Sequence, residues 1–247
     1  MKLVLEKAGD FQKSIDALAV LIDEAEFVLD ERGLTLKATD PSQISMVDFL
    51  LEKKDFKQFD VREKAKIGID LDYLRQIMSR AKPDDELTLE LDPDQNRLNV
   101  KFRGSSARKF NLPLIDISAA ELPNPKIEFD AEAKMLASVL QDALKDASLV
   151  SSHVSIGVEG DKFIVKADSS KGNLDSVTEK DKKNLLELNA KKDAMSMFPL
   201  DYLQDMLKTA LASTQILVCL KGNAPIQISY DIGPAHIKYF LAPRIES

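Results

Sequence analysis

A sequence match that occurs twice along this chain is the feature that most constrains its fold. The tetrapeptide Leu-Asp-Tyr-Leu stands at 71–74 and again at 200–203, and Lys-Ala stands at 37–38 and again at 166–167. Both matches are separated by the same 129 residues. Each also falls at the same point in the order of predicted helices and strands. Two matches in one register favour duplication of a structural unit over chance.

Hydrophobic periodicity predicts the same order of elements in both halves. The first half is predicted to hold a helix over 11–22 with Asp10 as a possible N-cap, a hairpin over 27–36, a strand over 44–51, a helix over 71–81 and strands over 87–91 and 98–102. The second half is predicted to hold a helix over 136–147, a hairpin over 154–165, a helix over 200–211 and strands over 216–220, 226–230 and 237–241. Short turns between neighbouring strands predict an α+β fold with antiparallel sheets.

The stretch between the halves, residues 117–129, is predicted to be a connector. Pro123 and Pro125 lack a backbone donor and disfavour helical geometry in the residue before each of them. Unlike a Gly/Ser tether, the connector has apolar side chains, which predicts a strap lying on protein surface. The predicted domains are therefore residues 1–116 and 130–247.

Composition narrows the class of protein. A chain of 247 residues with 44% hydrophobic and 30% charged residues is long and apolar enough for two folded domains. The net charge of −7 argues against a uniformly basic nucleic-acid coat, although one face can still be basic. The one cysteine fits a reducing compartment, and neither a signal peptide nor a membrane-spanning stretch is evident. We expect a cytosolic or nuclear protein without membrane association.

Catalytic chemistry is hard to assemble from this sequence. His153 and His236 stand in dissimilar contexts without the neighbours that complete a metal shell, and Cys219 lies in an apolar strand without a nearby base. Acidic clusters are candidate metal ligands, but they fall at helix starts and turns, where acids cap or are solvated. These clusters are Asp70 with Asp72, Asp84-Asp85-Glu86, and Asp92 with Asp94. No catalytic residue, cofactor or metal site is predicted.

Basic residues recur on the predicted helices. Arg75 and Lys82 are seven residues apart, Lys134, Gln141 and Lys145 are spaced to share a face of the predicted third helix, and Lys208 lies on the fourth. Helical spacing predicts that they share outer faces. A solvated face is the usual reading of such charge. The apparent concentration of acids in turns favours instead a surface that contacts phosphates without reading sequence.

The C-terminal segment carries a specific family resemblance. Residues 238–246, Lys-Tyr-Phe-Leu-Ala-Pro-Arg-Ile-Glu, resemble the C-terminal segment of the sliding-clamp family, proliferating cell nuclear antigen, and its archaeal members above all. The stretch 33–42, the segment 67–71 and the connector also match this family in order. The resemblance implies the DNA clamp fold, with two similar domains per subunit. It also implies three subunits in a head-to-tail ring, with helices lining the hole and sheets outside.

The family resemblance implies function as well. Duplex DNA passes through the ring, and DNA polymerase, clamp loader, flap nuclease and DNA ligase dock on it through short peptide motifs, so a processivity factor without catalytic activity is expected. The implied DNA-facing residues are Lys13, Arg75, Arg80, Lys82, Lys134, Lys145 and Lys208. Gln12, Ala19, Gln76 and Gln141 stand where related clamps often carry a basic side chain, which implies weak DNA contact.

Two protein-binding surfaces also follow from the resemblance. The implied partner-peptide groove comprises Ile44, Met46, Leu122, Pro123, Pro225, Tyr239, Phe240, Ala242 and Pro243. The implied subunit interface pairs an edge strand with Arg108, Lys109, Phe110 and Leu112 against one with Leu174, Ser176 and Val177 of the next chain. Asp142 and Asp146 are candidates for ion pairs to Arg108 or Lys82 across that seam, or are simply solvated.

Two alternatives remain open from sequence. The first alternative to a homotrimeric clamp is one subunit of a ring made from unlike paralogues. The second is a metal-dependent enzyme built on the acidic clusters. If the protein is archaeal, we expect it in the cytoplasm, associated with the nucleoid. If it is eukaryotic, we expect it in the nucleus.

Overall fold

Two compact units make up the chain in the computed structural model, which describes residues 1–247 except 93, 118–121, 123–124, 182 and 245–247. The first unit holds Met1–Pro41, Val47–Pro123 and Ile232–Ile237. The second holds Ser42–Met46, Asn124–Asp231 and Lys238–Ser247. Within the described residues, no helix has the length and apolar character needed to cross a bilayer.

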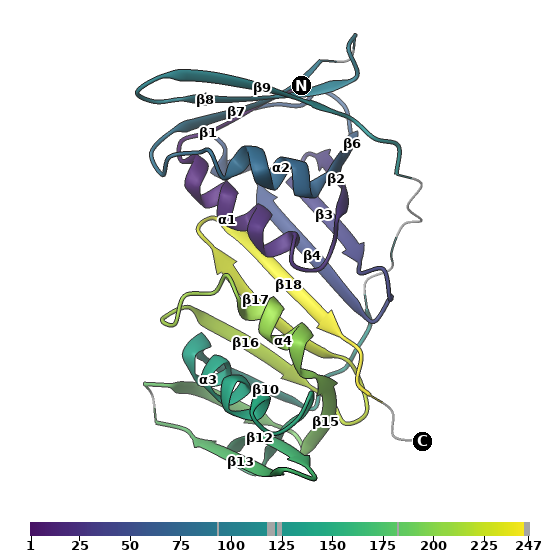
Figure 1. Cartoon of the computed structure of the whole chain (residues 1–247), viewed down its shortest axis with the longest axis vertical. Coiled ribbons are helices and arrows are strands. Elements are labelled where there is room, and N and C mark those ends of the chain that lie inside the picture. Colours follow the sequence, from purple (N-terminus) through teal and green to yellow (C-terminus); the bar gives the residue numbers. More distant parts are fainter. Residues whose placement is uncertain (93, 118–121, 123–124, 182, 245–247) are drawn as a thin grey trace. The chain divides into compact units, whose positions relative to one another are not determined.

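The first half of the chain forms two helices and two runs of antiparallel strands (Figure 1). Its elements are β1 (Lys2–Leu5), α1 (Ala8–Leu18), β2 (Glu24–Asp30), β3 (Gly33–Thr39), β4 (Ser45–Glu52), the 3₁₀ turn η1 (Lys53–Asp55), β5 (Gln58–Asp60), β6 (Ala65–Asp70), α2 (Leu71–Met78), β7 (Glu86–Asp92), β8 (Arg97–Arg103) and β9 (Ala107–Pro113). The strands are ordered β5-β1-β7-β8-β9 and β4-β3-β2-β6.

The second half repeats this plan. Its elements are β10 (Ala131–Leu136), α3 (Ala137–Ser148), β11 (His153–Glu159), β12 (Lys162–Ser169), β13 (Gly172–Glu179), β14 (Leu185–Ala190), β15 (Ala194–Pro199), α4 (Leu200–Leu207), β16 (Gln215–Leu220), β17 (Ile226–Ile232) and β18 (Ala235–Leu241). The strands are ordered β14-β10-β16-β17-β18 and β13-β12-β11-β15. When β1 is matched to β10 and α1 to α3, every later strand and α-helix and both strand orders correspond, and η1 alone among the described elements has no counterpart. The predicted duplication is therefore confirmed, as is the α+β class.

Three of the four helices, α1, α2 and α4, end earlier than their apolar periodicity predicts. Helix α1 ends at Leu18 and α4 at Leu207, although Ile22 and Leu211 continue the apolar spacing. Ile22 is still buried at 4% exposure, because the turn after α1 folds back onto the core, whereas Leu211 is 67% exposed. The predicted N-cap is also wrong, because Asp10 lies in the first turn of α1 and Lys7 occupies the cap position.

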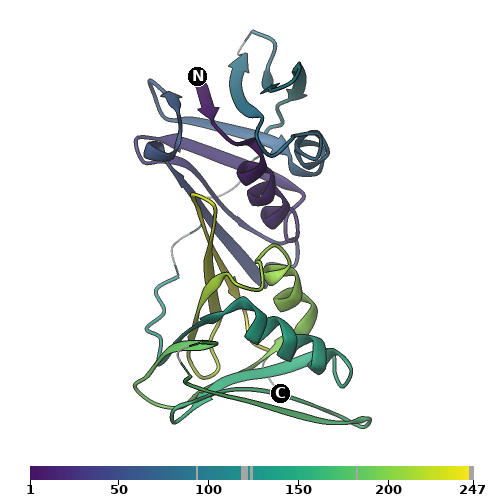
Figure 2. The same cartoon turned by 90° about the vertical axis from the view of Figure 1, so that its left-hand side faces the viewer.

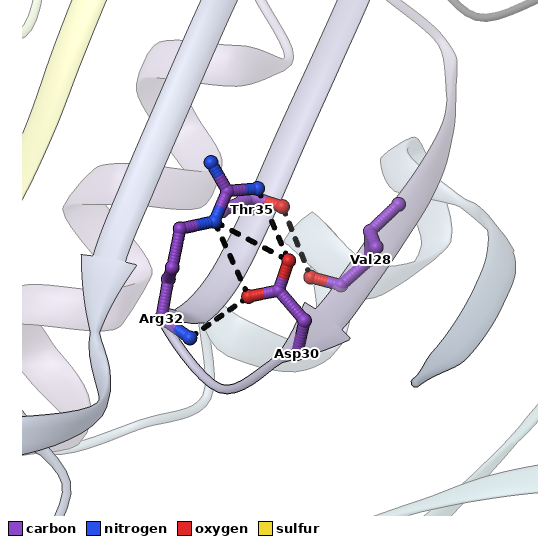
Figure 3. A network of polar contacts seen from close by, with 4 residues as sticks. All are labelled: Val28, Asp30, Arg32 and Thr35. Carbon is purple, nitrogen blue, oxygen red and sulfur yellow. Dashed lines mark hydrogen bonds and ion pairs between the residues drawn. The ribbon is translucent and has the colours of Figure 1, made fainter. Parts of the chain in front are cut away.

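Turn residues fix the first hairpin, which was predicted correctly. Strands β2 and β3 meet with Asp30 opposite Gly33, and Gly33 has φ of 140°, where a Cβ atom would lie 2.1 Å from the Leu51 carbonyl oxygen. The Arg32 backbone N–H donates to Asp30 Oδ1 at 2.9 Å, and the Arg32 guanidinium contacts the same carboxylate (Figure 3). The hydrogen bond from the Arg32 side chain lowers the pKa of Asp30. Thr35 Oγ1 donates to the Val28 carbonyl across the pair.

Two glutamines tie the helices of the second unit to each other. Gln141 Nε2 on α3 donates to the carbonyl oxygens of Leu207 and Ala210 at 3.0 and 2.9 Å. Gln204 Nε2 on α4 donates in the opposite direction, to the Leu144 carbonyl at 3.4 Å. Figure 2 shows α3 and α4 side by side against the strands of this unit. The Gln141 side chain adds to the Ala210 backbone N–H as a donor to the Leu207 carbonyl, and it gives the Ala210 carbonyl, just beyond α4, a hydrogen-bond donor.

Candidate functional site

The predicted groove residues of the second unit converge at the end of β18. The Ala242 backbone N–H donates to the Ile44 carbonyl at 2.8 Å, which joins the segment after β18 to the start of β4. Pro225 directly precedes β17, the neighbour of β18. Ile44, Pro225, Ala242 and Pro243 are half-buried. This part of the predicted groove is therefore a partly exposed apolar surface supported by strands.

Three of the groove residues lie deeper. Met46 is 9% exposed and Phe240 8%, whereas Tyr239 is completely buried. The Tyr239 ring lies 6.1 Å from the ring of Tyr230, whose hydroxyl donates to the Met206 carbonyl at 2.7 Å. Burial raises the pKa of Tyr239. Tyr239 is positioned to support the surface from beneath.

The connector residues of the predicted groove belong to the first unit. Leu122 is half-buried. Pro123 lies outside the described residues. The wall that these two residues were predicted to form therefore stays a prediction.

Basic residues on the helices are paired with acids of their own helix. Lys13 Nζ on α1 lies 3.9 Å from Asp10 Oδ1, and Lys145 Nζ on α3 lies 3.1 Å from Asp142 Oδ1. On α2, Arg75 Nη2 lies 3.2 Å from Asp72 Oδ1. All of these side chains are substantially exposed, so the pairs contribute little to stability. Each pair offsets one of the positive charges that the helices present.

The expected concentration of positive charge on the helices is wrong. Within their bounds, α1 to α4 hold three basic residues, Lys13, Arg75 and Lys145, against seven aspartates. Acids occupy first turns, where they interact favourably with the helix dipole, and outer faces as well. Arg80 and Lys82 follow α2, and Lys208 is the C-cap of α4, so these cations lie just outside the helices.

Two predicted shared faces do not exist. Lys134 lies in β10, where residues 131–136 alternate between buried and partly exposed, so it does not extend the face of Lys145 on α3. Lys82 lies four residues beyond the end of α2 at Met78, so its spacing from Arg75 is not a helical one. Lys134 Nζ is 3.8 Å from Glu187, and Lys82 Nζ donates to Ser105 at 3.0 Å.

The two strands predicted to form the subunit interface are both edges of their sheets. Strand β9 ends the order β5-β1-β7-β8-β9, and β13 ends the order β13-β12-β11-β15. An edge strand presents backbone donors and acceptors to another chain. On β9, Phe110 is half-buried and Leu112 is fully buried. On β13, Leu174 and Ser176 are half-buried and Val177 is 51% exposed.

Arg108 on β9 is occupied within its own chain. Its Nη2 forms an ion pair with Asp85, whose side chain is 3% exposed, and its Nη1 donates to the Arg80 carbonyl. The guanidinium lies 5.1 Å from the centre of the Phe102 ring, which contacts the ring of Phe110 at 6.0 Å. Asp85 Oδ2 also accepts from the Lys82 backbone N–H at 3.0 Å. Arg108 therefore fixes the edge strand to the end of α2.

Leu149 is a surface feature that periodicity did not single out. It follows α3 and is 79% exposed. Helix α3 packs on β12 and β13, so an exposed leucine lies at the end of the helix that supports the edge strand. Single exposed leucines are common on protein surfaces, so it is the position next to an edge strand that makes Leu149 a candidate interface residue. No periodic signal marks Leu149, because it lies just beyond the helix.

The acidic clusters are engaged in caps and turns. Asp70 accepts from the Tyr73 backbone N–H at 2.8 Å and caps α2, as predicted, and Asp92 accepts from Gln95 in the β7–β8 turn. Among the described residues, no three His, Cys, Asp or Glu side chains are grouped closely enough to hold a metal ion. Burial raises the pKa of the Cys219 thiol to about 12, which suppresses the reactive thiolate.

Comparisons with known proteins agree across the whole chain. The N-terminal domain of proliferating cell nuclear antigen matches residues 1–121, and the C-terminal domain matches residues 124–245. The chain is 37% identical over 248 residues to the DNA polymerase sliding clamp of Thermofilum pendens, with all of both chains covered. The domain matches alone account for nearly every residue.

Solved structures show the same fold and point to the family. The chain is similar to the clamp, PCNA, of Thermococcus kodakaraensis, with a TM-score of 0.94, 27% identity and coverage of 98% of this chain and 99% of that one. It also resembles A. fulgidus PCNA bound to the C-terminal region of FEN-1, with a TM-score of 0.88, 29% identity and coverage of 100% and 99%. A third similar structure is a PCNA2–PCNA3 complex of Sulfolobus tokodaii, with a TM-score of 0.89, 25% identity and full coverage of both chains. This chain belongs to the proliferating cell nuclear antigen family of DNA polymerase sliding clamps.

Proposed function

We propose that this chain is a DNA polymerase sliding clamp and processivity factor that encircles duplex DNA. Three copies close head to tail into a ring, and the ring tethers replication and repair enzymes to DNA. The observation that carries the proposal is the clamp fold over the whole chain. The family acts without catalysis, so the metal-dependent enzyme is set aside. We place the protein with the chromosomal DNA, as its archaeal relatives suggest.

The four helices line the hole in this proposal. Weak contact with phosphates comes from basic residues on the helices and beside them. Those on the helices are Lys13, Arg75 and Lys145, and those beside them are Arg80, Lys82, Lys134 and Lys208. Seven aspartates within the helices oppose strong binding. A topological link needs no tight contact, and weak, sequence-independent contact favours sliding.

The subunit contact pairs β9 of one chain with β13 of the next. Phe110, with Leu112 beneath it, lies on the face of β9 that also carries Arg108. On β13, Leu174 and Ser176 lie opposite Ala167 and Val165, which are buried. A continuous sheet aligns these inner faces, so Phe110 contacts the inner face of β13. We add Leu149 to this contact because of its exposure at the end of α3.

The outer faces of the same two strands have complementary charge. Lys109 on β9 is exposed, and Asp175 and Glu179 lie on the outer face of β13. Reversing one charge with Lys109→Glu should weaken the ring, and so should Asp175→Lys. The double variant should recover much of the loss, because it restores opposite charges. Lack of recovery would place Lys109 away from β13.

Native mass spectrometry tests ring closure directly. The unaltered protein should give three times the 27.5 kDa chain mass. Phe110→Asp should give single chains, because it places a charge in the apolar centre of the contact. Lys191→Asp, an exposed change elsewhere on the second unit, is the matched control and should leave the trimer intact. A trimer that persists in Phe110→Asp would refute the strand assignment.

Partner enzymes dock at the groove in this proposal. A short peptide places an apolar plug against Ile44, Met46, Leu122, Pro123, Pro225, Tyr239, Phe240, Ala242 and Pro243, with Tyr239 as support from beneath. A few buried apolar anchors usually dominate such binding. The peptide donors are the polymerase, the clamp loader, a flap nuclease and DNA ligase. The FEN-1 segment bound to A. fulgidus PCNA supports this assignment.

A heteromeric ring is the second candidate. It is favoured by the similarity to the PCNA2–PCNA3 complex of Sulfolobus tokodaii. The mass of the purified chain distinguishes the two candidates. A trimer formed by this chain alone supports the homomeric ring, and a monomer or dimer at micromolar concentration supports the heteromeric one.

A further inference from the structure

One face of the five-stranded sheet in the first unit carries a surplus of positive charge. Along β7, Leu87 and Leu89 are buried, whereas Glu86, Thr88 and Glu90 alternate onto the opposite face. Figure 1 shows α1 and α2 on one side of β1, β7, β8 and β9. The strand register places the side chains of Lys2, Lys101, Arg103 and Lys109 on the other side, with Glu86 and Glu90. We call this side the basic sheet face.

The cations on the basic sheet face outnumber the acids. A hollow of about 740 Å³ on this face is lined by two acids, Glu86 and Glu90, and by six cations, Lys2, Lys57, Lys101, Arg103, Arg108 and Lys109. Arg108 is paired with Asp85 on the opposite side of the sheet. Lys57 Nζ lies 2.6 Å from Glu86, and Lys101 pairs with Glu90. Lys2, Arg103 and Lys109 have no ion pair with any described residue. Three positive charges therefore remain, on a chain whose net charge is −7.

The arrangement of these cations carries an energetic cost. Lys101 lies directly opposite Lys109 across β8 and β9, and like charges in that position destabilise a sheet. Hydrogen bonds from Lys57 and Lys101 lower the pKa values of Glu86 and Glu90, so both acids stay ionised and are fully engaged. Lysine on an edge strand discourages aggregation, which accounts for Lys109 on β9. It does not account for Lys2 and Arg103, which lie on the inner strands β1 and β8.

The spacing of the charges indicates what would bind. Lys101 and Arg103 are two residues apart on β8, which separates them by about 6.8 Å. Alternate side chains of any extended peptide have the same spacing of about 6.8 Å. Phe102 is the one aromatic residue that lines the hollow among the described residues, and it is 1% exposed, so no ring is available for stacking a nucleic-acid base. We propose that the basic sheet face binds an extended acidic segment of a partner protein, with carboxylates on alternate residues.

This site is separate from the peptide groove and from the helices assigned to DNA. The groove binds apolar side chains of a peptide, whereas the basic sheet face would bind carboxylate side chains. Lys109 also neighbours β13 of the next chain in the proposed ring. Lys2 and Arg103 lie on inner strands, further from that edge, so they are the residues to substitute in a test of this site.

A labelled peptide of alternating glutamate and serine, titrated by fluorescence anisotropy with the full-length oligomeric protein, tests the proposal. The unaltered protein should bind the peptide, more weakly as salt rises. The double variant Lys2→Glu with Arg103→Glu should bind at least about tenfold more weakly, since two attractions become repulsions. The matched control, Lys183→Glu with Lys191→Glu, makes the same charge change on the second unit and should stay within about twofold of the unaltered protein.

Specific results would overturn the proposal. One is the absence of peptide binding to the unaltered protein, and another is equal binding by both double variants. Preferential binding of an oligothymidylate of matched length, lost in the same variant, would assign the face to nucleic acid instead. Native mass must be unchanged in both variants. If charge reversal prevents folding, Lys2→Gln with Arg103→Gln should still weaken binding severalfold, and unchanged binding there would refute the proposal.

Discussion

Breaking the ion pair between Arg108 and Asp85 should destabilise the first unit, and the two ways of breaking it should have different costs. Asp85 is 3% exposed at its side chain, whereas Arg108 is 26% exposed. Arg108→Met keeps the stem over Phe102 but leaves a buried carboxylate, with the Lys82 backbone N–H as its remaining hydrogen-bond donor. Removing one partner of a buried pair in this way costs about 3–5 kcal/mol.

Asp85→Ala should cost less. The Arg108 guanidinium keeps its hydrogen bond to the Arg80 carbonyl, its contact with Phe102 and some access to water. The loss of a charged hydrogen bond in that setting is about 1.5–3 kcal/mol. The double variant should cost less than the sum of the single ones, because it leaves no unpaired charge.

Guanidinium unfolding measures these free energies, at one fixed protein concentration because the ring dissociates on unfolding. Lys57→Met is the matched control. It breaks an ion pair of similar length on the same sheet, with side chains 52% and 27% exposed, and should cost at most about 1 kcal/mol. If Arg108→Met costs no more than Lys57→Met, or less than Asp85→Ala, the reasoning from burial is wrong.

Three further predictions test the groove, the first hairpin and the helix ties. Ile44→Arg should abolish calorimetric binding of a glutamine- and aromatic-containing partner peptide while native mass stays trimeric; retained affinity would contradict the groove. The pKa of Asp30 is lowered in the folded protein, so its ionised form adds stability above the ordinary carboxyl pKa, and this stability is lost as pH falls through the lowered value. Asp30→Asn should therefore be less stable than the unaltered protein at pH 7, and the difference should shrink as unfolding titrations are carried to acid pH. Gln141→Ala should speed amide exchange at the end of α4, because two carbonyl partners are lost, and unchanged exchange there would show that the ties are dispensable.

Turn chemistry made the hairpins predictable from sequence. Gly33 and Gly160 both have positive φ, at 140° and 60°, in the turns of the two hairpins predicted over 27–36 and 154–165. When a short loop joins two strands of alternating apolar and polar residues, each strand has few possible partners other than its neighbour in sequence. The duplication was predictable for a related reason, since a repeated motif constrains the order of everything between its two copies.

Helix ends and helix charge were not predictable in the same way. Apolar spacing continues past α1 because residues in the following turn are also buried, so periodicity marks burial rather than helix. Lys134 was placed with a helix although residues 131–136 alternate as a strand does, because the strand runs directly into α3. The pairing of Arg108 with Asp85 joins residues 23 positions apart, and no local pattern signals such a contact.

The glutamine ties between α3 and α4 limit how a tighter DNA grip can be engineered. Lysine at Gln141 would add a second cation to α3 beside Lys145, but it would remove the hydrogen bonds to the Leu207 and Ala210 carbonyl oxygens at the end of α4. Gln12 on α1 and Gln76 on α2 make no side-chain hydrogen bond to any described residue, and both reach solvent. The first helix pair is thus the half of this clamp in which charge can be varied without disturbing the scaffold.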